Sequence, residues 1–433
     1  MQPASLYRHY LAYPQVSTDT RAIKPDSLFF ALKGDRFNGN AYALEALEKG
    51  ARYAIIDEPQ YQQDERFILV PDVLTALQEL ARYHRSQLQI PVIGITGSNG
   101  KTTTKELLYA VLSRKFNTYA TQGNLNNHIG VPLTILSITA KTRLAIIEMG
   151  ANHPHEIAFL CNIARPSHGL ITNVGKAHLE GFGGFEGVKK TKGELYDYLA
   201  QHNGTVFIQH DNPLLHEMAT SRNIKQPVTY GFSAANDISG TLLSANPALE
   251  LNWHAQGETT VYRIATQLTG TYNTENLLAA ICVGHHFGVS SESINDAIAG
   301  YTPTNNRSQL TKTATNTVIC DYYNANASSM AAALENLSQI QAGRKAIILG
   351  DMFELGEAAY EEHGKLVQQA QAMGADRLIF VGREFFRHQR PGAAFYETTN
   401  EAKAALQQQP ITGALVLLKA SRSMAFEKLT DAL

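Results

Sequence analysis

Residues 91–112 read PVIGITGSNGKTTTKELLYAVL, and this stretch decides the fold. Its apolar, β-branched beginning predicts a buried strand that ends at Thr96, and the run that starts at Lys101 predicts a helix. A glycine-rich turn with Gly97 and Gly100 lies between them. Backbone N–H groups of such a turn, together with the N-terminus of the following helix, can bind phosphate groups. The stretch therefore predicts a strand–loop–helix unit of an α/β fold with a site for a polyphosphate.

The loop departs from the common phosphate-binding pattern G-x-x-x-x-G-K-[ST]. Counting back five residues from Gly100 gives Ile95, so the first glycine of that pattern is missing. The lysine and the hydroxyl are kept: Lys101 would neutralise the β- and γ-phosphates, and Thr102 would supply a magnesium ligand. An ordinary glycine turn before a helix is the alternative, but the strand, the helix and the regular glycine spacing favour a nucleotide. The loop residues expected to bind it are Gly97, Ser98, Asn99, Gly100, Lys101, Thr102 and Thr103.

The rest of the chain alternates apolar runs with helical patterns, which predicts three α/β blocks. Several runs end in glycine and polar residues, as strands of a parallel sheet do when ligands gather at their carboxyl ends. A turn-rich stretch at 300–309 predicts the break before the last block. The clearest expected strands are 28–32, 53–57 and 67–70, then 144–150, 169–175, 204–209, 227–232 and 248–255, then 316–323, 345–351, 376–382 and 414–421.

Composition limits the classes of protein that fit. A chain of 433 residues is too long for one core. Its 37 Lys plus Arg against 39 Asp plus Glu create no strong overall field for nucleic acid or an acidic membrane. Three widely spaced cysteines argue against a disulfide framework or a thiolate zinc site. No apolar stretch approaches the ~18 residues needed to span a bilayer, so we expect a soluble cytoplasmic protein.

Polar residues beyond the loop suggest further chemistry. Glu148 ends the apolar run 144–148. It could hold magnesium opposite Thr102, or it could only cap the next helix, and the residues alone leave both interpretations open. His153 and His155 lie two apart with no third ligand evident, so a zinc site is not expected.

Three lysines, Lys189, Lys190 and Lys192, crowd together in a predicted helical stretch. A solvated basic face is the simpler interpretation. Neighbouring cations also lower one another's pKa, which makes a neutral, reactive amine more accessible. Composition and spacing do not decide between the two.

Eight motifs resemble the Mur ligases and follow the order seen in that family. They are TGSNGKTT (96–103), EMGANH (148–153), ITNVGKAHLEGF (171–182), KGELY (192–196), GTYNTENLLAA (270–280), DYYNANASSM (321–330), LGDMFELGE (349–357) and LKASRSM (418–424). The resemblance covers about residues 17–427. The loop is shared by all Mur ligases and by folylpolyglutamate synthases. NLNNHIGVP (124–132) and the DYYNAN motif resemble the branch that adds D-alanyl-D-alanine.

The resemblance implies a three-domain Mur ligase architecture of the α/β class. Residues 1–86 would form a small UDP-substrate-binding domain and 87–302 a central parallel-sheet ATPase domain with the phosphate loop. Residues 303–433 would form a Rossmann-like domain that closes over ATP and binds the dipeptide. The implied reaction joins D-Ala-D-Ala to UDP-N-acetylmuramoyl-tripeptide through an acyl phosphate, at the cost of ATP. The implied enzyme is a monomer.

The resemblance also implies roles for individual residues. The catalytic group would comprise Lys101, His178 and Lys192. Two magnesium ions would be held by Thr102, Glu148, His178 and Lys192, the last as a carbamate formed with carbon dioxide. ATP contacts outside the loop would be Asn273, Asn276, Arg307 and Asp321. The UDP-substrate residues would be Asp19, Thr20, Arg21, Lys33 and Gly34. The peptide-substrate residues would be Asn126, Asn127, Asn324, Asn326, Ser329, Lys419, Ser421 and Arg422.

Some positions depart from the family pattern, and alternatives stay open. Ala327 and Ala420 replace a usual proline and glycine, and Tyr272 stands where histidine is common. A sister ligase that adds a single amino acid would share the loop and the metals, although the D-N-P-R motif of the diaminopimelate branch is absent. A P-loop NTPase or kinase would give Lys192 no role. A silent scaffold for cell-wall assembly would not need Lys101, Glu148 or Lys192.

Overall fold

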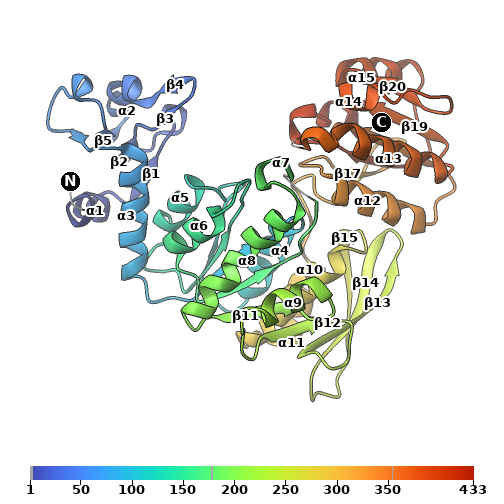
Figure 1. Ribbon diagram of the computed structural model, residues 1–433, viewed down its shortest axis with the longest axis horizontal. Coiled ribbons are helices and arrows are strands. Elements are labelled where there is room, and N and C mark those ends of the chain that lie inside the picture. The colour runs from blue at the N-terminus through green and yellow to red at the C-terminus, as the bar shows by residue number, and fades with distance from the viewer. Residues whose placement is uncertain (1–2, 177–178, 354) are drawn as a thin grey trace.

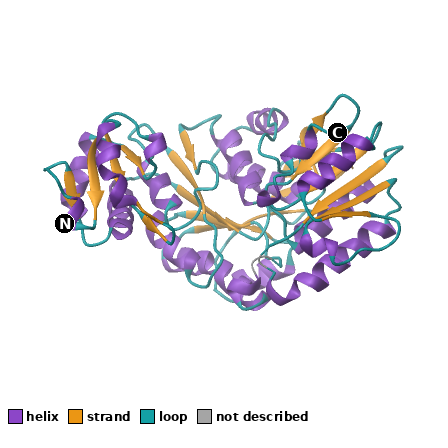
Figure 2. Ribbon diagram, turned by 90° about the horizontal axis from the view of Figure 1, so that it is seen from above, coloured by secondary structure: helices purple, strands orange, loops and turns teal. Residues whose placement is uncertain are grey.

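The computed structural model describes residues 3–176, 179–353 and 355–433. Three α/β units follow one another along the chain, each built on its own sheet. Figure 1 shows the first unit, in blue, at one end, the green and yellow central unit below, and the orange and red third unit at the other end. In Figure 2, helices pack against the sheets from both sides. No described helix has the length and apolar character needed to cross a membrane.

The first unit has a parallel four-stranded sheet in the order β1-β2-β5-β6 and a separate two-stranded ribbon, β3-β4. Its strands are β1 (Gln15–Ser17), β2 (Ser27–Phe30), β3 (Lys33–Gly34), β4 (Phe37–Asn38), β5 (Ala51–Ile56) and β6 (Phe67–Leu69), and its helices are α1 (Pro3–Ala12), α2 (Ala43–Glu48) and α3 (Val73–Gln87). Helix α3 begins where the Asp72 carboxylate accepts a hydrogen bond from Thr75 N. Its apolar face joins the core of the central unit, so one hydrophobic cluster spans both units.

The central sheet has nine strands in the order β15-β14-β13-β12-β11-β10-β7-β9-β8. They are β7 (Val92–Thr96), β8 (Thr118–Ala120), β9 (Leu144–Glu148), β10 (His168–Ile171), β11 (Thr205–Gln209), β12 (Val228–Gly231), β13 (Ile238–Ala245), β14 (Ala248–Ala255) and β15 (Tyr262–Thr269). Pairing is parallel from β8 to β13, as expected, but β14 and β15 extend the sheet in antiparallel fashion. The expected parallel sheet is therefore mixed at this end, where a hairpin connection replaces a helical crossover.

Helices cover the central sheet and buried apolar residues lie beneath them. These helices are α4 (Lys101–Leu112), α5 (Gly130–Leu136), α6 (Glu156–Ala164), α7 (Leu179–Phe182), α8 (Phe185–Gln201), α9 (Pro213–Thr220), α10 (Asn273–His286) and α11 (Ser291–Ala299). The following segment is tied to α4, because the Glu106 carboxylate accepts hydrogen bonds from Tyr301 Oη at 2.5 Å and from Asn305 Nδ2 at 2.9 Å. The segment that leads into the third unit is thus anchored to α4, the helix that follows the phosphate loop.

The third unit has six strands in the order β16-β17-β21-β18-β19-β20, parallel except for the edge strand β16. They are β16 (Gln309–Lys312), β17 (Thr317–Asp321), β18 (Lys345–Gly350), β19 (Arg377–Val381), β20 (Ala394–Tyr396) and β21 (Leu415–Lys419). Its helices are α12 (Ala327–Gln339), α13 (Ala359–Ala372), α14 (Arg383–Phe386), α15 (Thr399–Gln408) and α16 (Glu427–Thr430). A separate apolar cluster fills each face of this sheet. The carboxyl ends of β17 and β21 carry Asp321 and Lys419 toward the central unit.

Candidate active site

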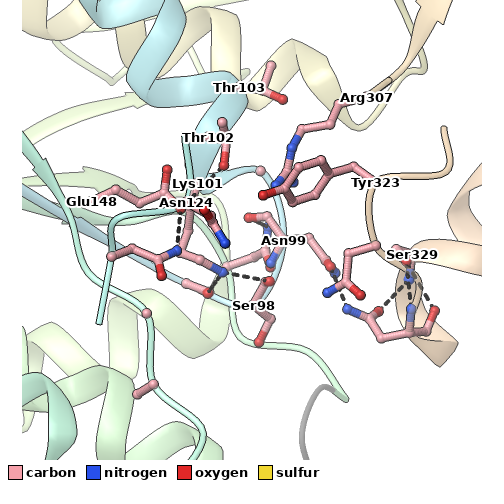
Figure 3. Close-up of a pocket in the computed structure, with 18 of the residues that line it drawn as sticks. Ser98, Asn99, Lys101, Thr102, Thr103, Asn124, Glu148, Arg307, Tyr323 and Ser329 are labelled. Atoms are coloured by element: carbon pink, nitrogen blue, oxygen red, sulfur yellow. Dashed lines mark hydrogen bonds between the residues drawn. The ribbon is translucent and has the colours of Figure 1, made fainter. Parts of the chain in front are cut away.

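A cavity of about 660 Å³ lies between the central and third units. Figure 3 shows the loop residues Ser98 and Asn99 on one side, and Arg307, Tyr323 and Ser329 on the other. Most of the expected site residues line it. They are Gly97, Ser98, Asn99, Gly100, Lys101, Thr102, Thr103, Asn126, Asn127, Glu148, Lys192, Asn273, Asn276, Arg307, Asp321, Asn324, Asn326, Ser329, Lys419 and Arg422.

The loop has the backbone shape that its glycines predict. Gly97 has φ +144° and Gly100, which precedes α4, has φ +79°, both values that favour glycine. A Cβ at Gly100 would lie only 2.7 Å from Asn276 Oδ1. The end of β10 holds the loop, because Thr172 Oγ1 donates to Asn99 O at 2.6 Å. The phosphate-binding turn is therefore preformed at the N-terminus of α4.

Lys101 folds back over this turn. Its Nζ donates to Gly97 O at 2.7 Å and to Ser98 O at 3.1 Å. The pKa of this ammonium is lowered to about 8: burial is the main cause, Glu148 opposes it, and the nearby Arg307 adds to it. Since this side chain bonds to backbone carbonyls and to no carboxylate among the described residues, its charge is available to an anion bound in the loop.

Glu148 is buried at the end of β9, beside the loop. Its Oε1 accepts hydrogen bonds from Thr102 Oγ1 at 3.3 Å and from Asn126 Nδ2 at 2.8 Å. Its Oε2 is buried and has no hydrogen-bond partner among the described residues. A buried carboxylate oxygen without a donor is costly unless a cation or donor joins it. Asn127 also lines the cavity, but its Oδ1 accepts from Gly130 N at 2.9 Å and so shapes the start of α5.

Lys192 projects from α8 into the cavity and is 2% exposed. Burial, and next the charge of Lys101, lower the pKa of its amine to about 7. Of the two interpretations left open for the lysine cluster, an effect of Lys189 or Lys190 on this pKa is not what the structure shows, and Lys189 pairs with Glu217 at 2.9 Å. The perturbing cation comes from the phosphate loop, far away in the sequence. His178, the other expected metal ligand in this region, lies outside the described residues.

The expected ATP residues outside the loop already make contacts within the protein. Asn276 Oδ1 accepts from Thr104 Oγ1 at 3.1 Å, and Asn276 Nδ2 donates to Asn273 Oδ1 at 2.8 Å. In the third unit, Asp321 Oδ2 accepts from Lys419 Nζ at 2.5 Å, and this lysine is 2% exposed. Asp321 and Lys419 thus form one ion pair at the cavity wall.

Side-chain hydrogen bonds link the loop directly to the third unit. Asn326 Nδ2 donates to Asn99 Oδ1 at 2.8 Å, and Asn99 Nδ2 donates to Ser328 Oγ at 2.9 Å. Ser328 Oγ donates to Asn326 Oδ1 at 2.9 Å and completes the ring. Asn326 also caps α12 reciprocally with Ser329. Two residues that were assigned to different substrates therefore form a contact between units.

The remaining expected residues lie elsewhere. Ser421 is buried, does not line the cavity, and its Oγ has no described partner. The five UDP-substrate candidates belong to the first unit and do not line this cavity. Asp19 caps a short 3₁₀ helix (Thr20–Ala22), and its carboxylate pairs with Arg21 Nη2 at 2.7 Å. Lys33, next to Gly34 in β3, pairs with Asp57 at 3.1 Å.

Sequence reasoning missed several lining residues, among them Tyr272, Ser308 and Tyr323. Tyr272 Oη and Ser308 Oγ share a hydrogen bond of 2.8 Å, and Ser308 N donates to Asp321 Oδ1 at 3.2 Å. The sequence offered one clue to them, which is that they lie close to predicted site residues: Ser308 follows Arg307, and Tyr323 lies two residues after Asp321. Such proximity does not tell which side chain faces a cavity.

Family models agree with this architecture along most of the chain. The Mur ligase family catalytic domain matches residues 13–85, the Mur ligase middle domain matches 95–284, and the Mur ligase glutamate ligase domain matches 306–422. The chain belongs to the Mur ligase family.

Individual relatives are similar over nearly their whole length. The UDP-N-acetylmuramoyl-tripeptide–D-alanyl-D-alanine ligase of Bacillus subtilis is 33% identical, over 98% of this chain and 96% of the relative. The Escherichia coli protein of the same name is 35% identical, over 96% and 93%. A crystal structure of MurF from Acinetobacter baumannii matches with a TM-score of 0.85 and 30% identity, over 96% of this chain and 92% of that one. MurF from Thermotoga maritima in complex with ADP matches with a TM-score of 0.86 and 26% identity, over 98% and 97%.

Proposed function

We propose that the protein is an ATP-dependent ligase that joins D-alanyl-D-alanine to UDP-N-acetylmuramoyl-tripeptide by an amide bond. One observation carries the proposal: the phosphate loop of the central unit and the polar carboxyl edge of the third unit line a single cavity. A reaction that first activates a carboxylate with ATP and then adds an amine needs both substrates beside the same phosphoryl group. The name shared by the relatives, and the ADP complex of the Thermotoga maritima structure, support this choice.

The loop supplies the electrostatics of the first step. A substrate carboxylate must approach the γ-phosphate of ATP, which brings two anions together, so charge neutralisation and alignment dominate catalysis. Backbone N–H groups at residues 97–102 and the Lys101 ammonium would hold the β- and γ-phosphates. Asn273 and Asn276 would border the adenine, and Arg307 and Asp321 would contact the nucleotide from the third unit. The carboxylate oxygen that attacks would leave with phosphate when the dipeptide amine forms the amide.

Magnesium fits the residues beside the loop. Glu148 Oε2 is buried without a donor, and the Thr102 hydroxyl contacts the other oxygen of the same carboxylate. Oxygen ligands of this kind are what Mg²⁺ prefers. We assign Thr102 and Glu148 to one magnesium ion, and His178 and Lys192 to a second. A bound magnesium ion would supply Lewis-acid stabilisation of phosphoryl oxygens.

Lys192 would serve the second ion as a carbamate. Its amine is buried and its pKa is lowered to about 7, so a substantial fraction is neutral near neutral pH. A neutral amine adds carbon dioxide and releases a proton, which replaces a cation with an anionic oxygen ligand. The unmodified ammonium would repel a metal ion, whereas the carbamate would attract one.

The other substrate residues follow the positions of the units. The peptide ends would meet near Asn126, Asn127, Asn324, Asn326, Ser329, Lys419 and Arg422, with the buried Ser421 behind them. The UDP end would reach the first unit at Asp19, Thr20, Arg21, Lys33 and Gly34. We infer domain boundaries at 86/87 and 302/303, supported by the end of α3 at Gln87 and by the segment 300–308, which lies outside helices and strands. A cytoplasmic monomer stays the expectation.

Phosphate release tests the function and its alternatives together. The assay contains ATP, magnesium and UDP-N-acetylmuramoyl-tripeptide, with D-Ala-D-Ala, single amino acids or no amine. We expect release that requires the dipeptide. Release stimulated instead by a single amino acid would assign the protein to a sister ligase. Release that ignores both substrates would indicate an NTPase, and no release at all would favour a scaffold.

A further inference from the structure

The ring of Tyr323 contacts two arginine side chains that line the cavity. Tyr323 lies in the turn between β17 and α12. The Arg307 guanidinium lies over the ring, 3.9 Å from its centroid, and Figure 3 shows the two side chains together. The Arg422 guanidinium lies 5.2 Å from the same centroid, and its Nη1 donates to Tyr323 Oη at 3.3 Å. All three side chains line the cavity.

No described carboxylate neutralises either arginine. Among residues 3–176, 179–353 and 355–433, no carboxylate forms an ion pair with Arg307 or Arg422. Arg307 Nε is buried and has no described hydrogen-bond acceptor. By contrast, the third cation of this unit in the cavity, Lys419, is paired with Asp321. Guanidinium groups without carboxylate partners in a cavity are suited to bind anionic groups of a ligand.

The backbone also directs Arg307 to the ring. Its two neighbours adopt left-handed conformations, with φ +55° at Asn306 and +49° at Ser308. Asparagine tolerates this conformation, but it is unfavourable for a serine such as Ser308 and persists where the surroundings impose it. Here Tyr323 N donates to Asn306 O at 3.3 Å, and Ser308 is held by Tyr272 and Asp321. Hydrogen bonds on both sides of Arg307 therefore hold the turn in which this residue contacts Tyr323.

We propose that Tyr323 is a positioning residue whose ring holds both anion-binding arginines: Arg307 for the transferred phosphoryl group of ATP and Arg422 for the carboxylate of the incoming dipeptide. This inference rests on the proposed ligase function. Stacking on an aromatic face orients a guanidinium while leaving its N–H groups free to donate. Because one ring contacts both cations, it sets the distance between the two anion sites. The dipeptide amine is thereby aligned with the activated carboxyl carbon.

Two substitutions distinguish the role of the Tyr323 ring from the role of its hydroxyl. Tyr323→Leu removes the stacking surface and the hydroxyl, whereas Tyr323→Phe keeps the ring and removes only the acceptor of the Arg422 hydrogen bond. Tyr322→Phe is the matched control, because Tyr322 is buried beside it, contacts Thr430 Oγ1 and does not line the cavity. Thermal unfolding of each variant reports whether the fold is kept.

The first readout is the affinity for a non-hydrolysable ATP analogue, measured by calorimetry. We expect about a 10-fold loss in Tyr323→Leu, in the range of a cation–π contact, and a loss below about twofold in Tyr323→Phe and Tyr322→Phe, which keep the stacked ring. Equal affinity in all four proteins would overturn the proposal that the Tyr323 ring positions Arg307. Equal losses in the Leu and Phe variants would overturn it as well, because stacking would then not be the cause.

The second readout is the preference for D-Ala-D-Ala over its C-terminal amide, as a ratio of kcat/KM values. A merely structural role would lower both values alike and leave the ratio unchanged. We expect the preference to fall at least about fivefold in Tyr323→Leu and partly in Tyr323→Phe, since Arg422 would lose its support. An unchanged ratio in Tyr323→Leu would overturn the role of Tyr323 toward the dipeptide. If the wild-type protein used neither D-Ala-D-Ala nor its amide, the proposed function would fail. The affinity for the ATP analogue would still test whether Tyr323 positions Arg307.

Discussion

Replacing Lys192 tests the proposal that a buried neutral amine becomes a carbamate ligand. With a pKa of about 7, about half of these amines are neutral at pH 7, against roughly 0.03% at the ordinary value of 10.5. The structure thus raises the reactive fraction roughly a thousandfold. We expect Lys192→Ala to lose at least about 100-fold in kcat, which corresponds to about 3 kcal/mol of transition-state stabilisation. Acetate should partly restore activity by occupying the position of the carbamate.

The assay pairs phosphate release with ¹³C NMR after addition of ¹³C-bicarbonate. A carbamate signal should appear in the wild-type protein, be absent from Lys192→Ala, and weaken as the pH falls below about 7, because protonation removes the neutral amine. Removing carbon dioxide should slow the wild-type enzyme. Lys189→Ala, in the same helix, is the matched control and should stay within about twofold, because its partly exposed ammonium pairs with the exposed Glu217. Activity that ignores carbon dioxide, together with a nearly active Lys192→Ala, would refute the reasoning.

Three other outcomes follow from the same structure. Lys101→Ala should abolish phosphate release because the loop loses its cation, and near-normal release would contradict the phosphate-loop assignment. Asn99→Ala removes two side-chain bonds to the third unit, worth about 1 kcal/mol each, so the radius of gyration from X-ray scattering should increase; unchanged scattering would argue against a link between units. Burial lowers the pKa of His168 from 6.5 to about 4, so its contribution to stability is complete above pH 6.5 and is lost as the pH falls toward 4, by about 3 kcal/mol at most. In His168→Phe, the urea midpoint of unfolding should therefore decrease less as the pH falls than in the wild-type protein. An equally steep decrease would show that His168 does not cause this loss of stability.

The sequence predicted features that depend on local pattern. The strand before the loop, the helix after it and four of the six strands of the third unit (β17, β18, β19 and β21) follow from apolar periodicity and glycine placement. The antiparallel end of the central sheet was not predicted. Strands β13 and β15 have mixed burial, and the Asn-Pro pair at 246–247 marks a turn between β13 and β14 without giving the direction of their pairing. Strand direction is decided by packing at that edge of the sheet, which local periodicity does not report.

The candidate site was predicted in its residues but not in its contacts. The sequence places Glu148 at a strand end, and the structure confirms that position beside Thr102. The sequence could not reveal that Lys192 lies near Lys101, because residues on the same turn of a helix can point to different partners. The ring of bonds from Asn99 to Asn326 and the Arg307–Tyr323 stack also depend on how two units pack. Such contacts arise only in the folded chain.

The most direct test of the account follows the oxygen of the substrate. UDP-N-acetylmuramoyl-tripeptide labelled with ¹⁸O in its terminal carboxylate is incubated with ATP, magnesium, D-Ala-D-Ala and the protein, and both products are analysed by mass spectrometry. Activation through an acyl phosphate predicts one ¹⁸O atom in the released phosphate and one in a product that contains the added dipeptide. Unlabelled phosphate, or a tripeptide that gains no dipeptide while ATP is consumed, would contradict the ligase mechanism.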